Sequence, residues 1–176
     1  EAWAELGRIP VDDLMHIRNR AAFDVARISE IEQTTHHDVI AFTTNLAENI
    51  GPASRHVHMG LTSNDVVDTA QGVRLKQAGA LIMQEFDRLT ATIRQFAIDK
   101  KDLVMIGRTH GIHAEPVTLG LKFLIYYHEM LRNRARLEAA FRSVAVGKIS
   151  GAVGTYAHTG LELQKRVCTK LGLAYA

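Results

Sequence analysis

Residues 82–96, IMQEFDRLTATIRQF, decide the fold of this chain. Their apolar side chains recur at alternating spacings of four and three residues, which is typical of a helix packed in a bundle. These side chains are Ile82, Phe86, Leu89, Ile93 and Phe96. The helical pattern extends over residues 62–102, and a helix of that length measures on the order of 50 to 60 Å. A domain of this size cannot bury so long a helix, so we expect it to pack against helices of a longer chain or of other subunits.

A second apolar pattern of the same kind covers residues 116–146 and predicts a second long helix. We expect the arginines of that helix on its solvated side. Between the two predicted helices lies RTHGIHAEP, residues 108–116, which we interpret as a polar connecting loop. Loops mounted on rigid elements often carry functional groups, and His110 and His113 can gain or lose a proton near neutral pH. By itself, the loop is equally compatible with a functional site and with an ordinary helix connection.

Shorter helical patterns surround the two long ones. Asp24 is predicted to cap the helix that follows it, and Gly51 ends an apolar run that reaches Ile50. Asp65 lies three residues after Thr62, an acidic variant of a capping box at the start of the first long helix. The sequence therefore predicts an all-α fold. The shorter predicted helices cover residues 1–6, 11–20, 25–35 and 161–171, and a glycine-containing segment at 147–155 is expected to pack closely through its backbone.

The composition is that of an ordinary globular protein. Of the 176 residues 47% are hydrophobic, and a formal charge of +2 from 21 basic and 19 acidic residues does not indicate a nucleic-acid groove. The single cysteine, Cys168, excludes an intramolecular disulfide and suits a reducing compartment. The sequence contains neither an apolar run of membrane-spanning length nor a signal peptide, so we expect a cytoplasmic protein with no membrane partner. The chain starts without Met, inside a predicted helix, and we expect it to be a piece of a longer protein.

Six of the 9 histidines fall in three clusters at predicted helix ends or connectors, namely His36-His37-Asp38, His56-x-His58 and His110-x-x-His113. Imidazoles beside a carboxylate suit a metal ion, but the sequence has neither a His-Glu-x-x-His helix nor a paired-cysteine motif, so we predict no metal site. A nucleophilic triad has equally little support, because Ser63 does not follow a strand. General acid–base chemistry on an anionic substrate held by helix ends, hydroxyls and imidazoles uses every cluster. In isolation, Thr62 and Ser63 fit a simple helix cap better than an anion site.

Four segments then identify a family. They are THHDVIAF (35–42), VHMGLTSNDVVDTA (57–70), GRTHGIHAEP (107–116) and GKISGAVGTY (147–156). In this order they closely resemble the adenylosuccinate lyase family, a branch of the fumarase/aspartase superfamily, and the resemblance covers essentially the whole chain. It implies that residues 1–61 are part of an N-terminal helical domain. It also implies that residues 62–176 are part of a central domain, where they form the first half of a bundle of long helices.

The resemblance implies a β-elimination that releases fumarate from adenylosuccinate, giving AMP, and from the succinylcarboxamide imidazole ribonucleotide of purine biosynthesis. A base removes the proton beside a carboxylate, and a general acid protonates the departing nitrogen. His110 matches the family's general acid and His37 matches a second catalytic histidine, while no cofactor or metal is expected. The positions that match substrate-binding residues are His36, where the family often has Arg or Asn, Asp38, His58, Thr62, Ser63 and Thr109.

The family's base is a serine in the pattern Gly-Ser-Ser-x-Met-Pro-x-Lys-x-Asn-Pro, which does not occur in these 176 residues. We therefore expect this segment alone to be inactive. The resemblance also implies a homotetramer that binds a small nucleotide and builds each active site from three subunits. Two alternatives stay open: a superfamily lyase acting on argininosuccinate or carboxymuconate, and a helical oligomerisation module without enzymatic activity. The form of residues 109–116 favours the purine enzyme.

Overall fold

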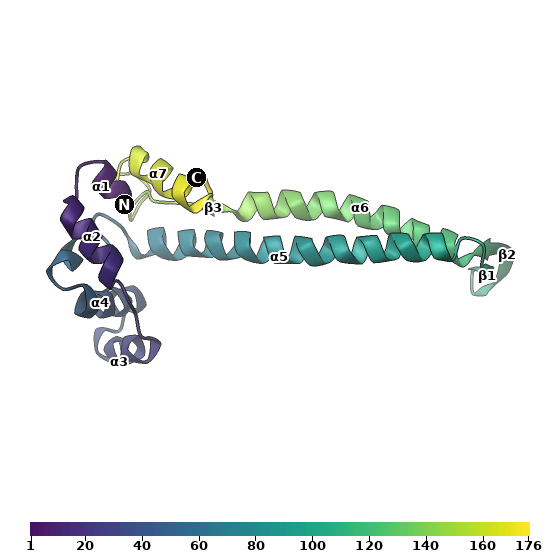
Figure 1. The fold of residues 1–176 in the computed structure, drawn as a ribbon, viewed down its shortest axis with the longest axis horizontal. Coiled ribbons are helices and arrows are strands. Elements are labelled where there is room, and N and C mark those ends of the chain that lie inside the picture. The colour runs from purple at the N-terminus through teal and green to yellow at the C-terminus, as the bar shows by residue number, and fades with distance from the viewer. The chain divides into compact units, whose positions relative to one another are not determined.

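The computed structural model describes residues 1–176, which divide into two compact units (Figure 1). The first unit comprises residues 1–72 and 146–176, and the second comprises residues 73–145. Residues 62–72 and 146–176, assigned by the sequence to the central domain, therefore share a unit with residues 1–61. The boundary at residue 61 concerns the domains of a longer protein and stays a prediction.

The first unit is built from short helices whose ends follow the sequence signals. Asp24 caps α3 by accepting the Arg27 N–H at 2.8 Å, as predicted. Gly51 ends α4 with a left-handed φ of 78°, a conformation that glycine adopts without strain. These helices are α1 (Ala2–Glu5), α2 (Val11–Arg20), α3 (Val25–Thr35), α4 (Asp38–Ile50), the 3₁₀-helix η1 (Pro52–His56) and α7 (Leu161–Leu171).

The buried centre of the first unit joins the two ends of the chain. One apolar cluster is formed by Ala2 of α1, Leu163 of α7 and Ile149, which lies between β3 and α7. The indole N–H of Trp3 donates to the Met59 carbonyl at 3.1 Å. Two short strands, β3 (Val146–Gly147) and β4 (Ala174–Tyr175), pair in parallel. Segments that are far apart in the sequence are thereby fixed next to one another.

Gly147 confirms the predicted close backbone packing of the glycine-containing segment. A Cβ on this residue would lie 2.7 Å from the Cys168 sulfur and 3.2 Å from a side-chain carbon of Thr69. Such distances leave no room for a side chain, so Gly147 allows its strand to approach α5 and α7 closely.

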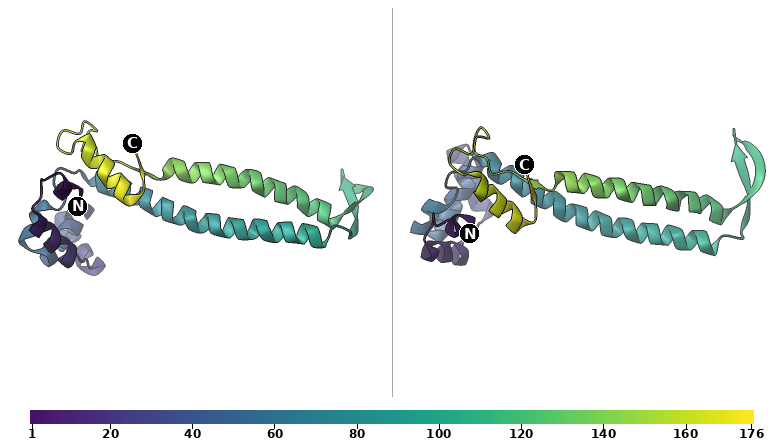
Figure 2. Two further views of the ribbon diagram at one scale, coloured as in Figure 1. Left: turned by 45° about the horizontal axis from the view of Figure 1, so that its top comes forward. Right: turned by 90° about the horizontal axis from the view of Figure 1, so that it is seen from above.

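Two antiparallel long helices make up most of the second unit, where they lie side by side in both views of Figure 2. They are α5 (Ser63–Asp99), which begins in the first unit, and α6 (Leu119–Val144). Phe96 and Phe123 pack across them with ring centroids 4.5 Å apart and ring planes tilted by 55°. Arg134 forms a two-pronged ion pair with Asp87, at 2.7 and 3.2 Å. Both predicted long helices are confirmed, although each is shorter than the pattern suggested.

The predicted loop at residues 108–116 is wrong, because this segment is part of a β-hairpin. Strands β1 (Val104–Thr109) and β2 (Ile112–Thr118) pair antiparallel. The turn residues His110 and Gly111 have φ of 52° and 75°, and two left-handed residues in succession are what a tight type I′ turn requires. Pro116, expected to begin the second helix, lies in β2 opposite Ile106.

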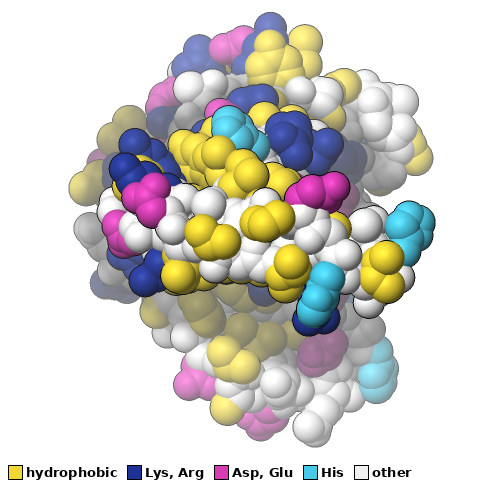
Figure 3. Space-filling model, turned by 90° about the vertical axis from the view of Figure 1, so that its right-hand side faces the viewer, with side chains coloured by type: hydrophobic (Ala, Val, Ile, Leu, Met, Phe, Trp, Pro, Cys, Tyr) yellow, Lys and Arg dark blue, Asp and Glu magenta, His cyan; other side chains and the backbone are white.

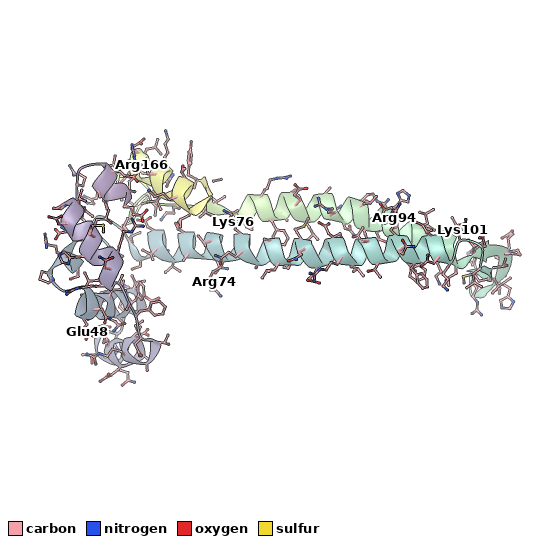
Figure 4. The ribbon with its side chains drawn as sticks, viewed as in Figure 1. Glu48, Arg74, Lys76, Arg94, Lys101 and Arg166 are labelled. Carbon is pink, nitrogen blue, oxygen red and sulfur yellow. The ribbon has the colours of Figure 1, made fainter.

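Much of the apolar surface of the second unit is uncovered within this chain. The predicted seam is only partly packed, since Ile82 and Leu89 are each about half exposed while Phe86, Ile93 and Phe96 are half-buried. A hollow of about 400 Å³ lies between the end of α5 and the start of α6, floored by apolar side chains that include Leu121 and Leu124. Arg94 and Lys101, labelled in Figure 4, line the same hollow. None of the helices is long and apolar enough to cross a membrane.

Candidate functional site

The backbone marks the four family-like segments. Only four non-glycine residues have a positive φ: His36 (51°), His58 (66°), His110 (52°) and Tyr156 (58°). Each lies in a different one of the four segments. A left-handed conformation costs an L-residue roughly 1–2 kcal/mol, and such strain tends to concentrate at binding and catalytic sites. At His36 and His110 the local cause is a helix end and a tight hairpin turn, so the coincidence marks the four segments in the backbone.

The first segment lies at the junction of α3 and α4. His36 ends α3 in the left-handed conformation, and the exposed Asp38 is the first residue of α4. His37 caps α4, and its Nδ1 accepts the Ile40 N–H at 3.3 Å. The same Nδ1 lies 3.3 Å from an Asp38 carboxylate oxygen. The side chain is partly exposed, so the imidazole is available to a ligand.

The second segment leads into α5. His58 lies in the connector after η1, and its Nε2 is buried without a hydrogen-bond partner. Thr62 and Ser63 lie at the start of α5, and their hydroxyl groups form no hydrogen bond within the chain. Free N–H groups and hydroxyls at a helix N-terminus favour an anionic ligand. A buried polar atom without a partner is uncommon in folded proteins, so the His58 Nε2 is a further unsatisfied group in this segment.

Asp65 connects the start of α5 to the fourth segment. Its carboxylate is completely buried and accepts the Thr62 N–H at 3.0 Å, which confirms one half of the predicted capping box. It also accepts the Lys148 ammonium at 3.0 Å and the N–H groups of Ser150 and Gly151 at 3.1 to 3.2 Å. Burial by itself raises the pKa of Asp65, but the Thr62 N–H and the Lys148 ammonium outweigh it, so the pKa is below its usual value.

Two further buried side chains hold the same backbone. The Thr69 hydroxyl accepts the Lys148 N–H at 3.0 Å and donates to the Lys148 carbonyl at 2.9 Å. The Gln164 side-chain oxygen accepts the Ile149 N–H at 2.8 Å, and its amide donates to the Tyr156 hydroxyl. Together with Asp65, these residues bind every N–H group of residues 148–151, which we call the strap. The strap is therefore fixed to α5 and α7.

The third segment is the β-hairpin of the second unit. His110 is exposed at its turn, with Thr109 and His113 exposed on either side. Figure 3, which faces the hairpin end, shows histidine and hydrophobic side chains together at the surface. A hollow of about 670 Å³ lies between the hairpin and α6, and Arg108 and Lys122 are among its lining residues. Neither Thr109 nor His110 has a side-chain partner within this chain.

The predicted site residues are thus distributed over both units. The first unit contains His36, His37, Asp38, His58, Thr62 and Ser63, and the second contains Thr109 and His110. Within the first unit, His37 has only local partners, Ile40 and Asp38, and forms no bond to His58, Thr62 or Ser63. None of the side chains forms a group of three or more His, Cys, Asp or Glu suited to a metal ion.

Sequence reasoning missed the role of the strap and of Lys148. The sequence predicts Asp65 only as a helix cap and the segment at 147–155 only as closely packed backbone. The residues that could have indicated this role are Asp65 and, about 80 residues later, Lys148 with Gly151 and Gly154. Nothing in that pattern alone indicates that Asp65 and Lys148 are 3.0 Å apart.

Comparison with known proteins shows the family of the chain. A curated adenylosuccinate lyase from Streptococcus mutans serotype c is 52% identical over 173 residues, covering 98% of this chain and 40% of the relative, so the chain spans well under half of that protein. A fumarate lyase from Mesorhizobium sp. BNC1 superposes with a TM-score of 0.91 at 30% identity, over 99% of this chain and 43% of that one. A 3-carboxy-cis,cis-muconate lactonizing enzyme from Pseudomonas putida gives 0.89 at 29% identity, over 99% and 42%. The family model described as Lyase matches residues 1–175, and the chain therefore belongs to this lyase family.

Proposed function

We propose that the longer protein containing this chain is an adenylosuccinate lyase. It releases fumarate by β-elimination from adenylosuccinate, giving AMP, and from the succinylcarboxamide imidazole ribonucleotide of purine biosynthesis. The observation that carries the proposal is the 52% identity to an adenylosuccinate lyase over 98% of this chain, which also supports the choice of substrate. Three histidines and a tyrosine with left-handed backbones, one in each family-like segment, add to it.

In this proposal His110 is the general acid. It protonates the nitrogen that leaves as the bond to the succinyl carbon breaks, and an imidazole suits this task because it can carry a transferable proton near pH 7. Its exposure at a hairpin turn leaves the ring accessible to a ligand. His37 supports acid catalysis and orients the substrate, and its capping bond to Ile40 holds the imidazole in place.

The remaining residues hold the anionic parts of the substrate. The unpartnered hydroxyls of Thr62 and Ser63 and the start of α5 receive the succinyl carboxylates. The buried, unpaired Nε2 of His58 gains a partner when an anionic group of the substrate binds. His36, Asp38 and Thr109 complete the binding residues.

The base and the assembly lie outside what this chain supplies. We propose that a serine of the Gly-Ser-Ser-x-Met-Pro loop pattern, absent from these residues, removes the proton, so that residues 1–176 alone are inactive. The uncovered apolar side of the second unit is consistent with a homotetramer whose active sites are shared between subunits. A cytoplasmic location accords with this role in nucleotide metabolism.

The test is to incubate the full-length protein with adenylosuccinate and to measure the release of fumarate. Rapid release supports the proposal, and residues 1–176 expressed alone serve as the inactive control. The second structural relative acts on 3-carboxy-cis,cis-muconate, so that compound and argininosuccinate are assayed in parallel. If the protein turned over either of these compounds but not adenylosuccinate, the proposed substrate would be wrong and the protein would have another activity of the superfamily. An assembled protein that releases no product from any of the three would favour a non-enzymatic oligomerisation module.

A further inference from the structure

Asp65 has more partners than a helix cap requires. Capping α5 needs only the bond from its carboxylate to the Thr62 N–H. The same carboxylate also binds the Lys148 ammonium and two N–H groups of the strap, while lying at 0% exposure. An ionised carboxylate can bind this many donors because both of its oxygens only accept hydrogen bonds. A neutral amide has one acceptor oxygen and an NH₂ donor, so it cannot bind the same set.

Thr69 provides a natural comparison. It lies one helical turn after Asp65 on α5, is 4% exposed and holds the same strap through both backbone groups of Lys148. It makes no bond to Thr62. Both side chains therefore fix the strap to α5, but only Asp65 also fixes the backbone of Thr62.

From this difference we propose that Asp65 is a positioning residue for the substrate's succinyl group. Its two oxygens hold the Thr62 backbone on one side and the strap on the other, so the start of α5 has one defined place relative to residues 148–151. The hydroxyls of Thr62 and Ser63 and the free N–H groups of the first turn are set by that placement. The inference rests on the proposed function, in which those groups receive the substrate's carboxylates.

The proposal requires both the charge and the length of Asp65. An amide at this position presents an NH₂ group where two donors already point, so the Thr62 bond or the strap bonds are lost. A glutamate keeps the charge and the acceptors but moves them by one methylene, which shifts Thr62 and Ser63 relative to the strap. A displacement of about 1 Å in a group that orients a substrate can cost on the order of 10²-fold in rate.

The test compares Asp65→Asn and Asp65→Glu with Thr69→Val in the full-length protein. The matched control removes a buried strap contact from the same helix without touching Thr62. For each variant we would measure the thermal midpoint, kcat and KM for adenylosuccinate, and the Kd for fumarate. The fumarate measurement does not depend on turnover, and Asp65→Glu keeps the comparison open if Asp65→Asn does not fold.

We expect both Asp65 variants to lower kcat/KM by about tenfold or more and to weaken fumarate binding, while Thr69→Val changes each by less than about threefold at a similar loss of thermal stability. Equal losses in Asp65 and Thr69 variants of matched stability, or unchanged fumarate binding in the Asp65 variants, would reduce Asp65 to a structural residue. A wild-type protein that turns over no adenylosuccinate would instead overturn the proposed function, and the positioning role with it.

Discussion

Gly120, the second residue of α6, packs directly against the backbone of Lys101. A Cβ built on Gly120 would lie 2.5 Å from the Lys101 Cα and closer still to the Ala97 carbonyl oxygen. The Gly120 N–H also donates to the Lys100 carbonyl at 2.9 Å. The beginning of α6 and the end of α5 are therefore in backbone contact, and this contact fixes where the hairpin with His110 leaves the two helices.

Gly120→Ala should destabilise the protein by roughly 1–3 kcal/mol, because backbone atoms cannot move aside to accept the methyl group. Gly79→Ala is the control, since its Cβ would meet the ring of Phe141 at 2.7 Å and a ring can shift. Urea unfolding of both variants measures the difference. A loss in Gly120→Ala no larger than that in Gly79→Ala would contradict the close approach.

His110→Ala should lower kcat for adenylosuccinate by at least about 10²-fold, the lower end of the contribution of a general acid. His113→Ala is the matched control: it removes an exposed imidazole three residues away on the same hairpin and should leave kcat within about threefold of wild type. Steady-state turnover of the full-length variants tests both. Near-normal turnover by His110→Ala would remove this residue from its proposed role.

Asp65 should make stability depend on acid pH. Its folded-state pKa is lowered by the Thr62 and Lys148 contacts against the effect of burial. Its contribution is therefore complete above the unfolded pKa of about 3.9 and is lost as the pH falls through the lower folded value. Between pH 7 and pH 3, Asp65→Asn should lose less free energy of unfolding than wild type.

Asp68→Asn serves as the control for this pH dependence, because Asp68 is exposed on the same helix. It should keep the wild-type acid dependence, including the parts due to Glu5, Glu48 and Asp87, whose pKa values are also lowered. Unfolding curves at several pH values give the comparison. Identical acid dependence in Asp65→Asn and Asp68→Asn would show that the Asp65 contacts contribute no proton linkage.

Local signals predicted most of the helices and their ends. Asp24 caps α3 and Gly51 ends α4 because capping and left-handed termination depend on one or two neighbouring residues. The sequence does not predict the hairpin, because the local signal at Pro116 is that of a helix start. Its place in β2 depends on pairing with Ile106, ten residues earlier.

The sequence by itself determined the helical class, the two long helices and the four segments that carry the candidate residues, because hydrophobic spacing and motif order are properties of the chain alone. Only the tertiary structure decided that Asp65, Thr69 and Gln164 converge on the strap, and that His36, His58, His110 and Tyr156 have left-handed backbones. The strap contacts join residues that are 15 to 86 positions apart, so they depend on how the chain folds back on itself. The left-handed backbones depend on how each helix end, turn and connector closes, which hydrophobic spacing and motif order do not specify.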